Sequence, residues 1–85
     1  MNKKITVQNG HGNLTYCILS GDENLEDQLN RWYYGSPNPE HGLCVQFNNS
    51  EIAVVDYYHA ETIGSIKVVS IEDTDEEPIL QWINL

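Results

Sequence analysis

The sequence predicts an α+β fold in which an antiparallel sheet of five to six strands packs against one amphipathic helix on one face, in the order β-β-α-β-β-β. Three observations predict it: alternating apolar residues at several places, one stretch with apolar residues at helical spacing, and short links between the later strands. At 85 residues the chain has the length of one small domain, and we expect residues 1–85 to form it.

The N-terminal part of the chain predicts a β-hairpin. Residues 4–8 alternate, with Ile5 and Val7 as the apolar positions. The sequence Asn-Gly-His-Gly at 9–12 is typical of a turn, so residues 13–19 are expected to form the second arm.

The middle of the chain predicts the helix. Ser20 and Glu23 fit the capping-box pattern, which places the helix start at this point. Gly35 is expected to end the helix, and the prolines at 37 and 39 prevent it from restarting. The apolar stripe between these limits consists of Leu25, Leu29, Trp32 and Tyr33.

The rest of the chain predicts strands. Residues 43–47 alternate, and residues 52–58 are apolar on both faces, as in a central, covered strand. Residues 63–71 are rich in isoleucine and valine, and an acidic turn follows at 72–78. Residues 79–85 are ambiguous between strand and helix, but their isoleucines favour a final strand.

Charge is the most unusual global property of the chain. Thirteen acidic residues against four basic ones give a net charge of −9, which repels nucleic acid and anionic membranes. A macromolecular partner is therefore expected to be a protein with a basic surface. With no apolar stretch near the roughly 20 residues of a membrane span and no signal-peptide pattern, we expect a cytoplasmic location, in which Cys17 and Cys44 are free thiols.

One set of residues has the chemistry of zinc ligands. His11, Cys17, His41 and Cys44 provide nitrogen and sulfur donors, but they lack the close Cys-x2-Cys spacing of zinc modules. Histidines in turns and small apolar cysteines in strands are the favoured interpretation. We therefore expect no metal and no other cofactor.

A second set has the composition of an acid-base site. Asp56 and Glu61 flank His59, which titrates near neutral pH. No nucleophile elbow or phosphate loop accompanies them, and a strongly negative chain is a poor environment for a reactive thiolate. A polar turn is the favoured interpretation, so we expect a protein with no catalytic residues.

A binding surface is the interpretation that the aromatic residues favour. Trp32 and Tyr33 are expected in the core, whereas Tyr34 falls off the stripe. Tyr57 and Tyr58 are expected to point to opposite sheet faces, so that at least one is exposed. Tyrosines anchor interfaces and carboxylates steer basic partners. The candidate partner-binding residues are Tyr34, Asp56, Tyr57, Tyr58, Glu72, Asp73, Asp75, Glu76 and Glu77.

A local resemblance to a known family supports this class of function. In the segment from Glu26 to Pro37, residues 28–37 have the pattern Gln-Leu-x-x-Trp-aromatic-Tyr-Gly-x-Pro. It resembles a family of small phage anti-CRISPR proteins that inhibit a type I surveillance complex by binding one of its backbone subunits. The resemblance covers about a dozen of the 85 residues and implies a class of protein, small acidic inhibitors of host nucleic-acid machinery, without assigning any contact residue.

Together these observations predict a non-enzymatic inhibitor from a phage or mobile element, active in the host cytoplasm. It would bind a basic host nucleoprotein effector, such as a CRISPR-Cas complex, and occlude its nucleic-acid-binding surface, partly by mimicking phosphates with carboxylates. It would bind neither nucleic acid nor membrane directly, and it could form a homodimer. The alternatives are an oligomer that sequesters a small signalling ligand between aromatics such as Trp32 and Tyr34, and a metal-dependent enzyme around His41, Cys44 and His59.

Overall fold

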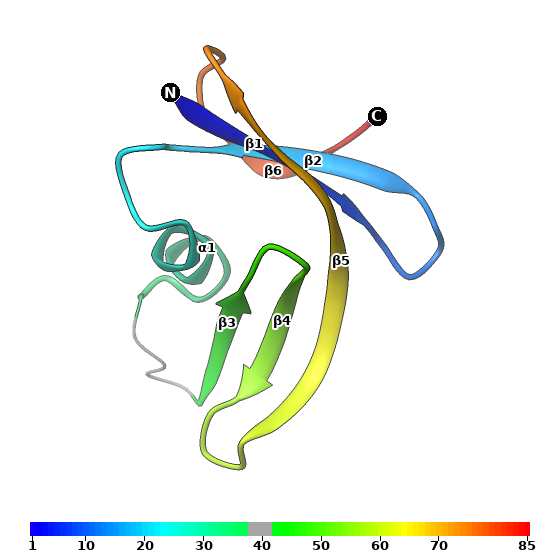
Figure 1. The fold of residues 1–85 in the computed structure, drawn as a ribbon. Helices are drawn as coiled ribbons and strands as arrows, with labels where there is room; N and C mark the ends of the chain where they lie inside the picture. Colours follow the sequence, from blue (N-terminus) through cyan, green and yellow to red (C-terminus); the bar gives the residue numbers. More distant parts are fainter. Residues whose placement is uncertain (38–41) are drawn as a thin grey trace.

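A computed structural model describes residues 1–37 and 42–85. It contains six strands and one helix in the predicted order, and the ambiguous final segment is a strand (Figure 1). The elements are β1 (Asn2–Gln8), β2 (Leu14–Leu19), α1 (Leu25–Tyr34), β3 (Leu43–Phe47), β4 (Glu51–Asp56), β5 (Glu61–Thr74) and β6 (Ile79–Asn84). No helix in the described ranges is long and apolar enough to cross a membrane.

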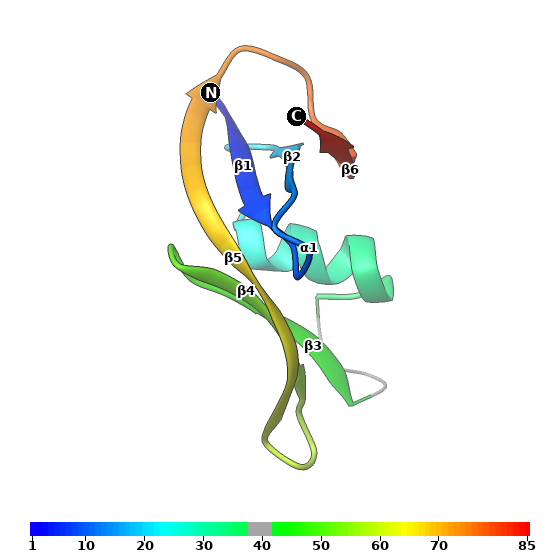
Figure 2. The same ribbon diagram turned by 90° about the vertical axis from the view of Figure 1, so that its right-hand side faces the viewer.

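All six strands belong to one antiparallel sheet with the order β3-β4-β5-β1-β2-β6. Strands β3, β4 and β5 form an antiparallel meander, as the short links between these strands predict. After β5 the chain does not continue this meander. It crosses over β1 and β2, and β6 pairs with β2 at the edge of the sheet opposite to β3 (Figure 2).

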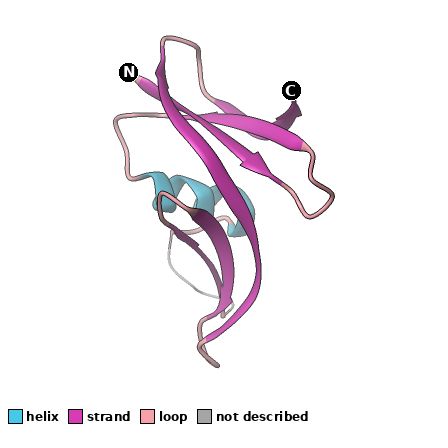
Figure 3. Ribbon diagram, turned by 45° about the vertical axis from the view of Figure 1, so that its right-hand side comes forward, coloured by secondary structure: helices cyan, strands magenta, loops and turns pink. Residues whose placement is uncertain are grey.

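Strand β5 is long and connects two halves of the sheet. Its first half pairs with β4 and its second half with β1, and Lys67 is the register partner of both Glu51 and Gln8. Register shifts interrupt both pairings, and such bulges bend strands. The sheet is consequently bent along β5, and α1 lies in the angle between the β3–β4 half and the β1–β2–β6 half (Figure 3).

The main core fills this angle. Leu29 of α1 is fully buried there, and the aromatic residues Trp32 and Tyr33 pack against the core, as their place on the helix stripe predicts. The Trp82 indole N–H of β6 donates to the Tyr33 hydroxyl at 2.8 Å, which ties the last strand to the helix. The buried members of this core are Ile5, Val7, Cys17, Leu19, Leu29, Val45, Ile52 and Val68.

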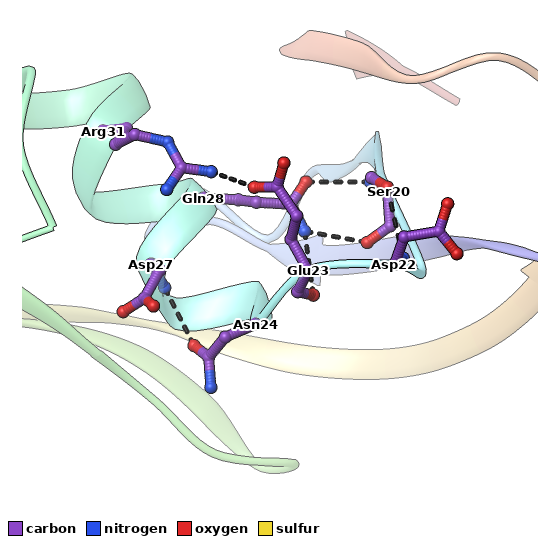
Figure 4. A network of polar contacts seen from close by, with 7 residues as sticks. All are labelled: Ser20, Asp22, Glu23, Asn24, Asp27, Gln28 and Arg31. Carbon is purple, nitrogen blue, oxygen red and sulfur yellow. Dashed lines mark hydrogen bonds and ion pairs between the residues drawn. The ribbon is translucent and has the colours of Figure 1, made fainter.

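The helix begins later than the capping-box pattern predicts. Its N-cap is Asn24, whose side-chain oxygen accepts the Asp27 amide at 3.0 Å (Figure 4). The Ser20 hydroxyl accepts the Asp22 amide instead, so Ser20 closes a local turn and caps no helix. Both residues are good caps by type, and the helix starts at the one directly before Leu25, the first residue of the apolar stripe.

A buried amide holds the segment before the helix in place. Gln28 accepts the Ser20 amide at 2.8 Å, and its own side-chain N–H groups donate to the carbonyls of Ser20 and Glu23 (Figure 4). Arg31 forms an ion pair with Glu23 one turn further along. The contacts of Gln28 satisfy backbone groups that a chain leaving a strand for a helix would otherwise leave unpaired.

The helix lies beside the edge of β3 as well as against the core. The Asn30 side chain accepts the Val45 N–H at 2.7 Å and donates to the Val45 carbonyl at 3.0 Å. Glu26 accepts the Phe47 N–H at 2.9 Å. Two helix side chains thus bind the backbone groups with which a further strand would pair. The helix was expected to pack on one face of the sheet, and it also covers the β3 edge.

The helix ends where the sequence predicts. Gly35 adopts φ 76°, and its N–H donates to the Arg31 carbonyl at 2.9 Å, as in a left-handed C-cap. The following prediction, that prolines prevent a restart, concerns Pro37 and Pro39, and Pro39 lies outside the described residues.

Replacing Asn30 with alanine tests the contact between helix and sheet edge. It leaves the N–H and carbonyl of buried Val45 without partners, so we expect the free energy of unfolding to fall by about 2–4 kcal/mol. Urea unfolding followed by circular dichroism measures this. Asn49→Ala, at an exposed turn position, is the matched control and should change the free energy by less than about 0.5 kcal/mol. Equal effects of the two substitutions would contradict the assigned role of Asn30.

Candidate partner-binding surface

The connection between β4 and β5 forms an exposed aromatic tip, defined here as residues 56–61. Strand β4 ends at Asp56, so the expectation that Tyr57 and Tyr58 lie in a strand and point to opposite sheet faces is wrong. Both lie in the turn, and both are exposed, by 59% and 70% of their surface. The expectation that at least one is exposed is confirmed. Their rings meet edge to face, with centroids 6.1 Å apart.

Asp56 organises this tip. One carboxylate oxygen accepts the amides of Tyr58 at 3.1 Å and His59 at 3.2 Å, and the other lies 2.8 Å from the His59 ring nitrogen Nδ1. The hydrogen bonds from His59 and Tyr58 lower the pKa of Asp56, with the His59 ring as the largest cause. The cluster of Asp56 and His59 is thus an ordered turn, in agreement with the favoured interpretation of this segment.

A glycine outside the tip determines where the tip lies. The Tyr57 N–H donates to the Gly42 carbonyl at 2.6 Å, and the Tyr58 ring lies against Gly42. A Cβ atom at position 42 would stand 2.7 Å from the Tyr58 ring, and Gly42 has φ 81°, which favours glycine. The segment entering β3 therefore supports one side of Tyr58 and leaves the rest of its ring exposed.

The surroundings of the tip are apolar and acidic. Ile63 lies next to it on β5 and is 61% exposed. Glu61 pairs in register with Asp56, so two carboxylates flank the tyrosines. Residues 55–66 include neither lysine nor arginine. A surface with exposed tyrosines and carboxylates fits a partner with basic side chains.

The other acidic candidates lie at the opposite end of the molecule (Figure 1). Glu72 and Asp73 belong to β5 and not to the turn in which the sequence places them, because this strand continues along β1 as far as Thr74. Lys3 forms an ion pair with Asp73 and lowers its pKa. The exposed turn that follows carries Asp75, Glu76 and Glu77.

Tyr34 belongs to neither of these surfaces. It is half-buried and packs against the main core, with its ring edge-on to Tyr33 at a centroid distance of 6.2 Å. The candidate residues therefore occupy three places: the aromatic tip, the acidic end and the helix terminus. Among these candidates, only Asp56, Tyr57 and Tyr58 lie together, and the two tyrosines form an exposed aromatic surface.

The candidate metal ligands are not assembled by the described residues. No group of three or more histidine, cysteine, aspartate or glutamate side chains lies close enough for a metal within residues 1–37 and 42–85. Cys17 lies in the main core, whereas Cys44 packs with Ala53 and Val55 in a second cluster. Both cysteines are free thiols, as predicted. His41 lies outside the described residues.

Two residues next to the tip are not identifiable as part of this surface from the sequence. Gly42 gives no signal of its own, because the ring that it supports comes from a segment that follows it by sixteen positions. Ile63 looks like an ordinary strand residue, but the whole first part of β5, residues 61–65, is exposed. Its neighbour Glu61 was noticed for acid-base chemistry and not as part of a binding surface.

The pKa of Asp56 is directly measurable. Because it lies below the ordinary value of 3.8, the ionised carboxylate stabilises the turn above this pH, and the stabilisation is lost as pH falls through the lower, folded-state pKa. NMR titration of the Tyr58 and His59 amides should give a midpoint below 3.8. In Asp56→Asn this transition should be absent, whereas a midpoint at or above 3.8 would contradict the assigned hydrogen bonds.

The thiols are predicted to be unreactive in the folded protein. Burial raises the pKa of Cys17 to about 12, and burial followed by the negative charge of Glu26 raises that of Cys44. A thiol reagent such as Ellman's should label neither cysteine rapidly at neutral pH and both in denaturant. Fast labelling of Cys44 in native protein would instead indicate that the β3–β4 half opens readily.

Comparison with protein-family models, with curated proteins and with solved structures finds no match to this chain. The resemblance of segment 28–37 to anti-CRISPR proteins therefore stays a hypothesis that rests on the helix and its glycine stop. The functional assignment depends on the aromatic tip and on the distribution of charge.

Proposed function

We propose that this protein is a small acidic inhibitor that binds a basic surface of a host nucleoprotein effector and excludes nucleic acid from it. The observation that carries this proposal is the aromatic tip, where Tyr57 and Tyr58 are exposed by 59% and 70% on a turn that Asp56 holds in place. We infer that the tip is the anchor of the complex.

The chemistry of the tip suits such an anchor. A tyrosine contributes a large apolar area and a polar hydroxyl at a low cost in rotamer entropy. A tip that is already ordered by Asp56 and Gly42 loses less conformational freedom on binding than a flexible loop would. Basic side chains of a partner, arginines above all, can stack on the tyrosine rings and pair with the carboxylates of Asp56 and Glu61.

The remaining charge of the chain supports a steering role. Asp75, Glu76 and Glu77 lie at the far end from the tip, so one flat contact does not engage both places (Figure 1). A net charge of −9 still attracts a basic surface from any direction and raises the association rate. Steering by the whole molecule and anchoring by the tip are therefore separate tasks in this proposal.

We also propose where the protein comes from and which effector it binds. The resemblance of the helix segment supports a phage or mobile-element protein that acts in the host cytoplasm, with a type I CRISPR surveillance complex as the first partner to test. The same charge that attracts a basic protein disfavours direct binding to nucleic acid or to an anionic membrane.

The test measures target-DNA binding by a purified, guide-loaded type I surveillance complex in the presence of this protein. We expect inhibition that weakens with added salt, and we expect Tyr57→Ala and Tyr58→Ala each to raise the inhibitory concentration by roughly thirtyfold, as for residues that anchor an interface. Val69→Ala removes an exposed side chain of β5 away from the tip and should change it by less than about twofold.

Two results would count against this proposal. Full inhibition by both tyrosine variants would show that the tip is not the anchor. If neither this effector nor a nucleoprotein co-purified from the native host forms a salt-sensitive complex, charge does not guide the protein to its partner.

A further inference from the structure

The two edge strands of the sheet, β3 and β6, differ in whether other residues cover their outward backbone groups. At β3, Asn30 and Glu26 occupy the backbone groups of Val45 and Phe47 that face away from β4. The outer edge of β6 has no such cover among the described residues, although uncovered edges are places where further strands can pair.

The end of β6 presents free backbone groups in a known direction. The Leu85 N–H donates to the Leu14 carbonyl at 3.2 Å, so residue 85 faces β2. Because backbone groups alternate along a strand, the N–H and carbonyl of Asn84 point outward, away from β2. The register shift between β2 and β6 lies before this point, and the ladder is regular again from Ile83 onward.

No charged side chain lies in the two strands at this edge, although the molecule as a whole is strongly acidic. Residues 5–21 and 78–85 contain no aspartate, glutamate, lysine or arginine, and these ranges include all of β2 and β6. Natural edge strands are commonly blocked by charged residues or by proline within the strand, and β6 has neither. Two copies with a charge of −9 each would bring no charged side chain of β2 or β6 together if they met here.

Two exposed leucines and a surface hollow lie next to the edge. Leu14 and Leu85 are exposed by 41% and 66%, and they border a surface hollow of about 510 Å³ together with Gly12, Asn13 and Asn84. A symmetric dimer requires protruding and hollow parts on the same patch, because each copy uses the same surface. Leucines beside a hollow meet this requirement.

We propose that two copies of this chain associate through β6, edge to edge and antiparallel, with the outward N–H and carbonyl of Asn84 in the shared ladder and the leucines of each copy packed at the hollow of the other. The antiparallel arrangement places the two acidic turns at opposite ends of the paired edge, where they repel one another least. The inference goes beyond the inhibitor function and leaves the aromatic tip of each copy free, since the tip lies at the far end from β6 (Figure 1).

The experiment measures the mass of the purified protein by light scattering over a range of concentrations and salt. We expect a concentration-dependent species of twice the 9.7 kDa chain mass. Added salt should strengthen it, because screening weakens the repulsion between two acidic copies. This salt effect is opposite in sign to that expected for binding a basic effector, and no effector is needed, so the two proposals fail independently.

Two variants locate the interface. Asn84→Pro removes an N–H that points outward and leaves the bond from Leu85 to Leu14 intact, and Leu14→Lys places a charge beside the hollow. Each should raise the dimer dissociation constant by roughly tenfold or more, since every change occurs twice in a symmetric dimer. Val69→Lys, which puts the same charge on an exposed position of β5, should leave it within about twofold, apart from its small effect on net charge.

Three results would overturn this inference. The first is a single-chain mass at all concentrations and salt levels. The second is a dimer that persists in both variants while their circular dichroism and melting temperatures show that they are folded. The third is a monomer whose inhibition of the effector is lost in the two β6-edge variants, which would show that this edge binds the partner and not a second copy.

Discussion

The contact between Asn30 and the two backbone groups of Val45 fixes the rest of the architecture. It attaches the helix to the edge of β3, so that Leu29 on the neighbouring position enters the core between the two halves of the sheet. An amide side chain is suited to this place because it donates and accepts at once, as a neighbouring strand would. The helix thus closes one edge of the sheet and helps to fill its bend, while the opposite edge at β6 stays uncovered.

The bend along β5 has an equally direct effect on the functional surfaces. One strand runs from the aromatic tip to the acidic end, so the exposed tyrosines and the exposed turn of carboxylates lie as far apart as the fold allows. Carboxylates that lie more than a Debye length from a partner bound at the tip act on it only through a screened field. Asp56 and Glu61, in contrast, can contact the same partner surface as the tyrosines. This separation therefore favours the proposed anchoring by the aromatic tip, with steering by the net negative charge, over phosphate mimicry by all the acidic residues together.

Local sequence patterns predict the helix and the strands correctly. They do not predict the features that depend on contacts between residues far apart in the sequence. The helix stripe, the stop at Gly35 and the N-terminal hairpin depend on neighbours in sequence, and all are found. The order of the sheet depends on β6 passing over β1 and β2, which periodicity does not encode. The end of β4 was missed because the Asp56 carboxylate competes for the amides that would continue the strand, and the half-burial of Tyr34 depends on packing at the helix end.

The position of β1 constrains how the chain can fold. It lies in the interior of the sheet, yet one of its two neighbours, β5, is separated from it by three strands and the helix along the sequence. During synthesis the first hairpin must wait, with one side of β1 unpaired, until β5 has emerged from the ribosome. Such non-local pairing slows folding, because the entropy of loop closure is lost before the contact forms. Until then the inner edge of β1 is a site for wrong pairing, and the lysines at positions 3 and 4 are the charges that oppose it.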